Sequence, residues 1–139
     1  MEKFKFLDIT TADVAFEAYG KDLDELFANS ALAMFEVMIN TKQVEKKIGK
    51  NVKVRGNDLQ SLMFNWLNEL LVFVDSENLV FSGFKVEIKK EKFTLSAACK
   101  GEKIDSKRHE IRTLVKAATY HQMKIEKNKI WKSRVILDI

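Results

Sequence analysis

The segment IWKSRVILDI, residues 130–139, decides how the rest of the chain is expected to fold. Val135, Ile136 and Leu137 follow one another without a polar residue, whereas a strand with one solvated face alternates apolar and polar residues. A strand that is apolar on both faces belongs inside a sheet, between two partner strands. We therefore expect an inner strand here, interrupted at Asp138.

The preceding segment offers one partner for this strand. Residues 115–125, VKAATYHQMKI, are typical of a strand, and a polar turn around Asn128 separates them from the last segment. A second hairpin is predicted in FKVEIKKEKFTLSAAC, residues 84–99, with a short turn near Lys90 and Glu91. The alternation of NVKVR, residues 51–55, predicts a further strand.

Two segments have the helical period instead. In residues 23–39 the apolar residues recur at i, i+3 and i+4, and Asp22 with Glu25 three residues later is typical of a helix start. Residues 59–74 repeat this spacing, and we expect Asn57 to be the N-cap.

These elements predict an α+β fold in which two helices pack on one face of a largely antiparallel sheet. Strands and helices do not alternate regularly, and neither GxGxxG nor GxxxxGK[ST] occurs, which argues against a nucleotide-binding α/β fold. The 139 residues contain no Pro and no low-complexity linker. We expect a single domain over residues 1–139.

The composition, 46% hydrophobic and 32% charged, is that of a globular protein. No apolar run approaches the roughly 20 residues of a membrane span, and no signal-peptide core is found, so we expect a cytoplasmic protein. Cys99 is the only cysteine, which excludes an intrachain disulfide and a thiolate zinc cluster within one chain. Its alternation with apolar neighbours predicts a buried residue rather than a nucleophile.

Basic residues gather in two places. They are Lys42, Lys46, Lys47, Lys50, Lys53 and Arg55 in the first, and Lys124, Lys127, Lys129, Lys132 and Arg134 in the second. One interpretation is a solvated surface with charged edges that resist edge-to-edge pairing. The other is a docking patch for RNA or for an acidic protein, although no aromatic pattern for reading bases accompanies the lysines.

The two histidines lie in different surroundings. His109 belongs to the polar segment KIDSKRHEIR, and His121 follows the alternation of residues 115–125, which predicts a position at a sheet edge or at the margin of the core. Neither lies in an HExxH motif, and no GxSxG is present. The sequence therefore shows no hydrolytic machinery.

Two aspartates interrupt apolar segments at opposite ends of the chain. Asp138 interrupts the last strand, and Asp13 interrupts TTADVAF, residues 10–16. A carboxylate withdrawn from water needs a cation or hydrogen bonds. If the first and last strands are neighbours, Asp13, Asp138 and the main-chain carboxylate of Ile139 converge on a hard divalent cation, Ca²⁺ first, with Mg²⁺ or Mn²⁺ as alternatives. Alternatively, Asp13 caps a turn and Asp138 pairs with a nearby lysine or arginine.

The chain resembles the archease family over essentially its whole length. The resemblance is carried, in order, by TTADVAFEAYG, DLDELFANSALAMFEVM, GEKIDSKRHE, VKAATYH and ILDI. It implies a small cytosolic protein that activates the RNA-splicing ligase, which joins a 2′,3′-cyclic phosphate or 3′-phosphate end to a 5′-hydroxyl end. It also implies that the protein is not itself an enzyme and meets tRNA through the ligase.

The resemblance also implies site residues. Asp13 and Asp138, with the chain end at Ile139, correspond to the metal-binding acidic cluster, and Lys116 to the lysine of a Val-Lys-Ala element. His109 and His121 match motif histidines to which we assign no role. Thr10 stands where the family usually has histidine, and a hydroxyl cannot replace an imidazole ligand.

The resulting hypothesis is that the acidic cluster places a divalent cation beside the ligase's histidine nucleophile and GTP phosphates, so that guanylylation is promoted. Lys116 would contact a phosphate or a carboxylate of the partner. Two alternatives remain from other classes. One is a metal-dependent phosphoester hydrolase, and the other is an RNA-binding or chaperone-like module that uses the lysine-rich sheet faces.

Overall fold

The computed structural model describes residues 2–139, so Met1 of the predicted domain lies outside the described residues. The elements in chain order are β1 (Phe4–Ile9), β2 (Asp13–Gly20), α1 (Leu23–Met38), β3 (Ile48–Arg55), α2 (Leu59–Glu77), β4 (Leu79–Lys89), β5 (Thr94–Lys103), β6 (Ala117–Lys127) and β7 (Trp131–Asp138), with short 3₁₀ turns at Thr41–Gln43 and Lys90–Lys92. Both predicted helices and both predicted hairpins are confirmed.

The strands form two antiparallel sheets. The four-stranded sheet has the order β1-β2-β7-β6, and the three-stranded sheet has the order β3-β5-β4. β7 is an inner strand between β2 and β6, as the apolar run Val135–Leu137 predicts. Alternation within a strand shows which residues face the core but does not name the partner strand, so the division into two sheets was not predicted.

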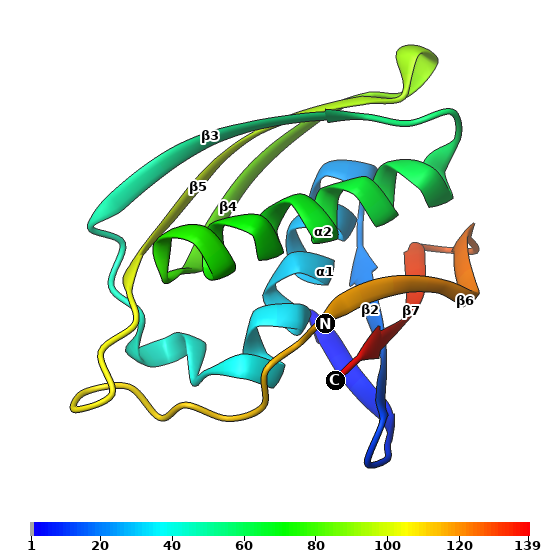
Figure 1. Cartoon of the computed structure of the whole chain (residues 1–139). Coiled ribbons are helices and arrows are strands. Elements are labelled where there is room, and N and C mark those ends of the chain that lie inside the picture. Colours follow the sequence, from blue (N-terminus) through cyan, green and yellow to red (C-terminus); the bar gives the residue numbers. More distant parts are fainter. Residues whose placement is uncertain (1) are drawn as a thin grey trace.

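The two helices lie between these sheets (Figure 1). α1 packs mainly against β2 of the four-stranded sheet and β4 of the three-stranded sheet, and α2 packs mainly against β6 and β3. The predicted class, two helices packed against antiparallel strands, is confirmed. In place of one sheet with a single covered face, however, two sheets cover the helix pair.

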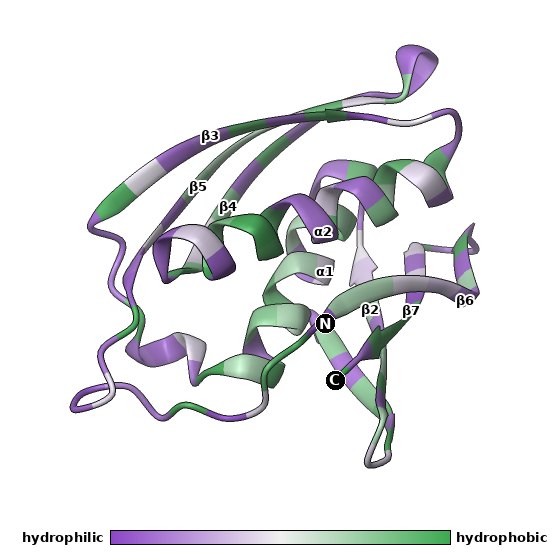
Figure 2. Ribbon diagram, in the orientation of Figure 1, coloured by the Kyte–Doolittle hydropathy of each residue, from purple (hydrophilic) through white to green (hydrophobic). Residues whose placement is uncertain are grey.

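The core is apolar along most of α1, which Figure 2 shows largely in the hydrophobic colours. Two internal hydrogen bonds fix the layers. The indole N–H of the buried Trp66 donates to the carbonyl oxygen of Phe27 at 2.9 Å, which links α2 to α1. The hydroxyls of Ser30 and Ser133 lie 2.8 Å apart and link α1 to β7. Each bond satisfies a polar group that would otherwise be buried without a partner.

The helix starts agree with the sequence in one case and differ in the other. The Asp22 carboxylate accepts a hydrogen bond from the Glu25 amide at 2.9 Å, as predicted for α1. The prediction of Asn57 as the cap of α2 was wrong, because the N-cap is Asp58. Its carboxylate accepts from the Ser61 amide at 2.7 Å, and the Ser61 hydroxyl accepts from the Asp58 amide at 3.1 Å. This reciprocal pair is a capping box in which serine takes the usual place of glutamate.

Cys99 is fully buried on β5, as predicted. Burial raises the pKa of its thiol to about 12, so the nucleophilic thiolate is not formed near neutral pH. Neither helix found within residues 2–139 is long and apolar enough to cross a membrane.

Candidate functional site

The pairing of β2 with β7 places Asp13 directly opposite Asp138. The cation hypothesis required the first and last strands to be neighbours; the last strand, β7, lies beside β2, and the first strand, β1, lies on the other side of β2. The Ile139 amide donates to the carbonyl oxygen of Ala12 at 3.0 Å, so the main-chain bonds flank the aspartate pair instead of joining it. In such a non-hydrogen-bonded pair the Cα atoms approach to about 4.5 Å and the side chains are closest.

The two carboxylates lack a counter-charge. In the described part of the chain, neither the Asp13 carboxylate nor the Asp138 carboxylate takes part in an ion pair or a hydrogen bond. The alternative in which Asp13 caps a turn and Asp138 pairs with a lysine or arginine therefore has no counterpart here. The expectation that both carboxylates are withdrawn from water was wrong for Asp13. Asp13 is exposed, and only Asp138 is half-buried. Their mutual repulsion across the strand pair is what a cation would relieve.

Thr10 builds the turn that presents Asp13. Its hydroxyl oxygen accepts hydrogen bonds from the amides of Ala12 at 3.1 Å and Asp13 at 2.9 Å. Its own amide donates to the carbonyl oxygen of Asp13 at 2.8 Å. Such a hydroxyl-capped turn fixes the main chain over residues 10–13. Thr10 thus positions Asp13 at the start of β2.

Lys116 lies beside the same strand end. Its amide donates to the carbonyl oxygen of Asp138 at 2.8 Å, and the next residue, Ala117, is the register partner of Asp138 on β6. The Lys116 side chain is exposed. A cation on a flexible stem is therefore attached to the main chain beside Asp138.

We call Asp13, Asp138 and the main-chain carboxylate of Ile139 the acidic tip. Its donors are all carboxylate oxygens, which are the ligands of hard cations such as Ca²⁺ and Mg²⁺. Within residues 2–139, no three His, Cys, Asp or Glu side chains lie close enough to hold a metal on their own. The residues fit a cation only if the Ile139 carboxylate joins the two aspartates, and they leave coordination positions for water or for a partner's groups.

His109 lies away from the acidic tip, in the segment between β5 and β6. The polar surroundings in sequence suggested a loop side chain, but the imidazole is completely buried. Its Nδ1 accepts from the Asp105 amide at 2.9 Å, so Nε2 carries the proton and donates to the Glu102 carboxylate at 2.9 Å. Both ring nitrogens are used, and His109 anchors the segment.

Glu102 is the centre of this second cluster, although its sequence surroundings do not predict such a role. Besides His109, its carboxylate accepts from Arg108 and from the Glu45 amide at 2.7 Å. Burial alone would raise the pKa of Glu102, but the hydrogen bonds from Arg108, the Glu45 amide and His109 outweigh it and lower the pKa to about 2. A glutamate among polar residues carries no sequence signal of burial, which is why it was overlooked.

His121 is exposed on β6, an edge strand of the four-stranded sheet, which is where alternation predicted it. The register of β6 with β7 shifts between Thr119 and Lys124, and Gln122 in this bulge has a φ of 53°. A bulge re-aims the side chains that it contains. His121 also lies four residues along β6 from Ala117, the register partner of Asp138, so the structure does not bring it to the acidic tip.

Comparison with known proteins gives concordant matches. A model of the Archease protein family (MTH1598/TM1083) matches residues 4–139. The chain is 49% identical over 126 residues to the protein archease of Sulfurisphaera tokodaii, covering 91% of this chain and 90% of that protein. It is 46% identical over 142 residues to the protein archease of Methanothermobacter thermautotrophicus, covering 100% of both. The solution structure of Methanobacterium thermoautotrophicum protein 1598 is similar with a TM-score of 0.86, 45% identity and coverage of 100% of both chains.

Proposed function

This chain belongs to the archease family, and from that premise we propose that it activates an RNA-splicing ligase by promoting the ligase's guanylylation and repeated turnover in tRNA splicing. The observation that carries the proposal is the unneutralised register pair of Asp13 and Asp138. Two like charges placed opposite each other at a strand end cost stability, which a site for a divalent cation explains. We propose the cytoplasm as the place where it meets the ligase.

The residues of the acidic tip have separate tasks in this proposal. Asp13 and Asp138 hold the cation from two strands, and the Ile139 carboxylate completes the protein ligands. The bound cation, Ca²⁺ or alternatively Mg²⁺ or Mn²⁺, supplies charge neutralisation for phosphoryl oxygens in the ligase site. Thr10 keeps Asp13 in place through its two amide hydrogen bonds. Lys116, which lies beside Asp138, contacts a phosphate or a carboxylate of the partner.

Exposed apolar side chains at the same end support contact with a protein. Five of them lie on β1 or in the segment that leads to β6: Phe6, Leu7, Ile9, Ile111 and Leu114. A cavity of about 240 Å³ joins this region, with Phe6, Ile9, Thr113 and Ile139 among its lining residues. Exposed apolar patches mark interaction sites. We propose that this rim contacts the ligase while the acidic tip enters its active site.

The surroundings of the tip favour an activator over a hydrolase. A phosphoester hydrolase needs a base or nucleophile beside its metal. His109 is engaged by Glu102, Cys99 is buried, and His121 lies on the β6 bulge. Among the residues that the structure describes, the tip thus offers ligands without a catalytic partner.

The test is a guanylylation assay with the purified ligase and folded variants of this protein. Asp13→Ala and Asp138→Ala should each abolish most of the stimulation, whereas Asp75→Ala, an exposed aspartate on α2, should stimulate like the unchanged protein. Full stimulation by both tip variants would overturn the proposal. Turnover of phosphoesters by the isolated protein would instead support the hydrolase.

A further inference from the structure

The second basic group of the sequence, Lys124, Lys127, Lys129, Lys132 and Arg134, gathers at the far end of the four-stranded sheet, and we call it the hairpin cluster. β2 and β7 pair without a register shift. Because Phe16 and Val135 face the core, the alternate residues on each strand share the uncovered outer face. Lys132 and Arg134 therefore lie on the same face as Asp13 and Asp138.

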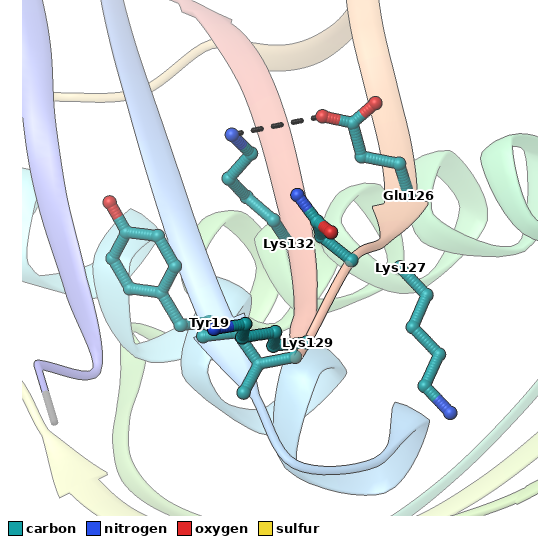
Figure 3. Close-up of a pocket in the computed structure, with 7 residues that line it drawn as sticks. Tyr19, Glu126, Lys127, Lys129 and Lys132 are labelled. Carbon is teal, nitrogen blue, oxygen red and sulfur yellow. Dashed lines mark ion pairs between the residues drawn. The ribbon is translucent and has the colours of Figure 1, made fainter.

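The hairpin cluster lines two adjoining cavities. One of about 420 Å³ has Tyr19, Lys127, Lys129 and Lys132 in its wall, and one of about 150 Å³ has Lys124, Lys132 and Arg134. Both cavities have Lys132 and Glu126 in their walls, so they adjoin, and we call the two together the groove. Figure 3 shows Lys132 facing Glu126 across the hairpin, with Tyr19 on the neighbouring strand.

The positive charge of this groove is only partly neutralised. The Lys132 ammonium is 3.7 Å from a Glu126 oxygen and 3.9 Å from a Glu17 oxygen, which are long ion pairs. Over residues 2–139, no carboxylate lies within ion-pair distance of Lys124, Lys127, Lys129 or Arg134. The Arg134 guanidinium donates to Gln122 at 3.2 Å, yet its buried Nε has no acceptor. Both carboxylates thus lie near Lys132, whereas the Lys127 ammonium lies 6.0 Å from the Trp131 ring centroid.

We propose that the hairpin cluster binds the phosphate backbone of single-stranded RNA directly. Protein–protein interfaces are depleted of lysine and centre on apolar groups, whereas nucleic-acid interfaces are polar and strongly positive. The groove matches the second kind, since five of its ten lining residues are lysine or arginine. Tyr19 adds an aromatic ring beside the cations, the combination by which proteins hold unpaired strands without reading sequence. This binding goes beyond activation of the ligase, and its test needs no ligase.

The groove lies on the same sheet face as the acidic tip. The pair Tyr19–Lys132 lies six residues along the strands from the pair Asp13–Asp138. At about 3.4 Å per residue, the two ends of the face are roughly 20 Å apart. An RNA strand held by the hairpin cluster and laid along β2 and β7 would reach the acidic tip. If the proposed activation is correct, the same face guides an RNA end toward the ligation site.

The experiment measures fluorescence anisotropy of a short labelled single-stranded RNA with the protein alone, at rising KCl and without divalent cations. The unchanged protein should bind, and log K should fall with log[KCl] at a slope of about −2, as expected when two to three phosphates are neutralised. The variant Lys127→Glu/Lys129→Glu should bind at least about tenfold more weakly. Both lysines are exposed and lie at the hairpin turn, so the fold should persist.

The matched control is the variant Lys53→Glu/Lys100→Glu, which replaces two exposed lysines of the three-stranded sheet. It changes the net charge by the same amount as Lys127→Glu/Lys129→Glu. It should retain most of the affinity. Three results would overturn the proposal: no binding of RNA by the unchanged protein, an equal loss in the control variant, or equal competition by an acidic peptide of the same charge, which would assign the groove to an acidic protein.

Discussion

Asp13 and Asp138 face each other as register partners on β2 and β7, although 124 residues separate them in the chain. The hydrogen bond from the Ile139 amide to Ala12 continues the ladder past this pair, so the strand ends are held together by main-chain bonds and not by the side chains. The fold therefore places two like charges opposite each other, although the pairing of the strands does not depend on these side chains.

Removing one charge of the pair should stabilise the protein when divalent cations are absent. Asp13→Asn keeps the shape of the side chain and relieves the like-charge repulsion, so we expect a gain of up to about 1 kcal/mol in the free energy of unfolding. Thermal unfolding in EDTA measures it. Asp75→Asn serves as a control, since it removes an equal charge from an exposed position on α2. A lower melting temperature for Asp13→Asn than for this control would argue against repulsion at the pair.

Thr10 should matter through its hydroxyl. Thr10→Val leaves the Ala12 and Asp13 amides without their acceptor, and we expect a loss of about 1 kcal/mol and a weaker cation affinity. Thr10→Ser keeps the acceptor and should behave like the unchanged protein. Urea unfolding and a Ca²⁺ titration of both variants check this. Equal stability and equal Ca²⁺ affinity of the Thr10→Val and Thr10→Ser variants would show that the hydroxyl does not position Asp13.

Glu102 should make stability depend on pH. Its pKa is about 2 in the folded protein and about 4.5 when unfolded, so its contribution is complete above pH 4.5 and is lost as the pH falls toward 2. The shift corresponds to roughly 3 kcal/mol. Urea unfolding at a series of pH values measures it. Glu102→Gln should flatten the curve in this window, and an unchanged slope in the variant would show that other carboxylates dominate.

Gly101 on β5 should not tolerate a side chain. A Cβ there would lie 1.8 Å from the Val80 carbonyl oxygen and 2.7 Å from the Phe81 Cα, and both belong to the neighbouring strand's main chain. We expect Gly101→Ala to lose about 3 kcal/mol of stability. Gly49 on β3 has no atom within 4 Å of such a Cβ, so Gly49→Ala should be neutral or slightly stabilising. Equal melting temperatures for the two variants would contradict the packing described here.

The sequence predicted the local elements well, because the periodicity of residues 23–39 and 59–74 and the apolar run at 135–137 report directly on burial. That strands near the two chain ends are neighbours was a condition of the cation hypothesis, and the pairing of β2 with β7 meets it. It did not predict the division into two sheets, because alternation identifies a face and not a partner. The α2 cap was misplaced by one residue because Asn57 and Asp58 are both good caps, and only the Ser61 hydroxyl decides between them.

The candidate site was foreseen less completely. Asp13 and Asp138 were named because they interrupt apolar segments, and the structure places them together. The role of the Thr10 hydroxyl depends on a turn geometry that no periodicity reveals. The burial of His109 and Glu102 likewise depends on how the segment between β5 and β6 folds back, and polar composition alone predicts exposure for such residues.

The most direct test of the account is a calorimetric titration of Ca²⁺ into the unchanged protein, Asp13→Asn and Asp138→Asn. We expect one ion per chain in the unchanged protein and at least about a tenfold weaker association in each variant, since each loses one of the carboxylate ligands. Binding of equal strength in all three proteins, or the absence of any binding to the unchanged protein, would contradict the claim that this aspartate pair is built to share a cation.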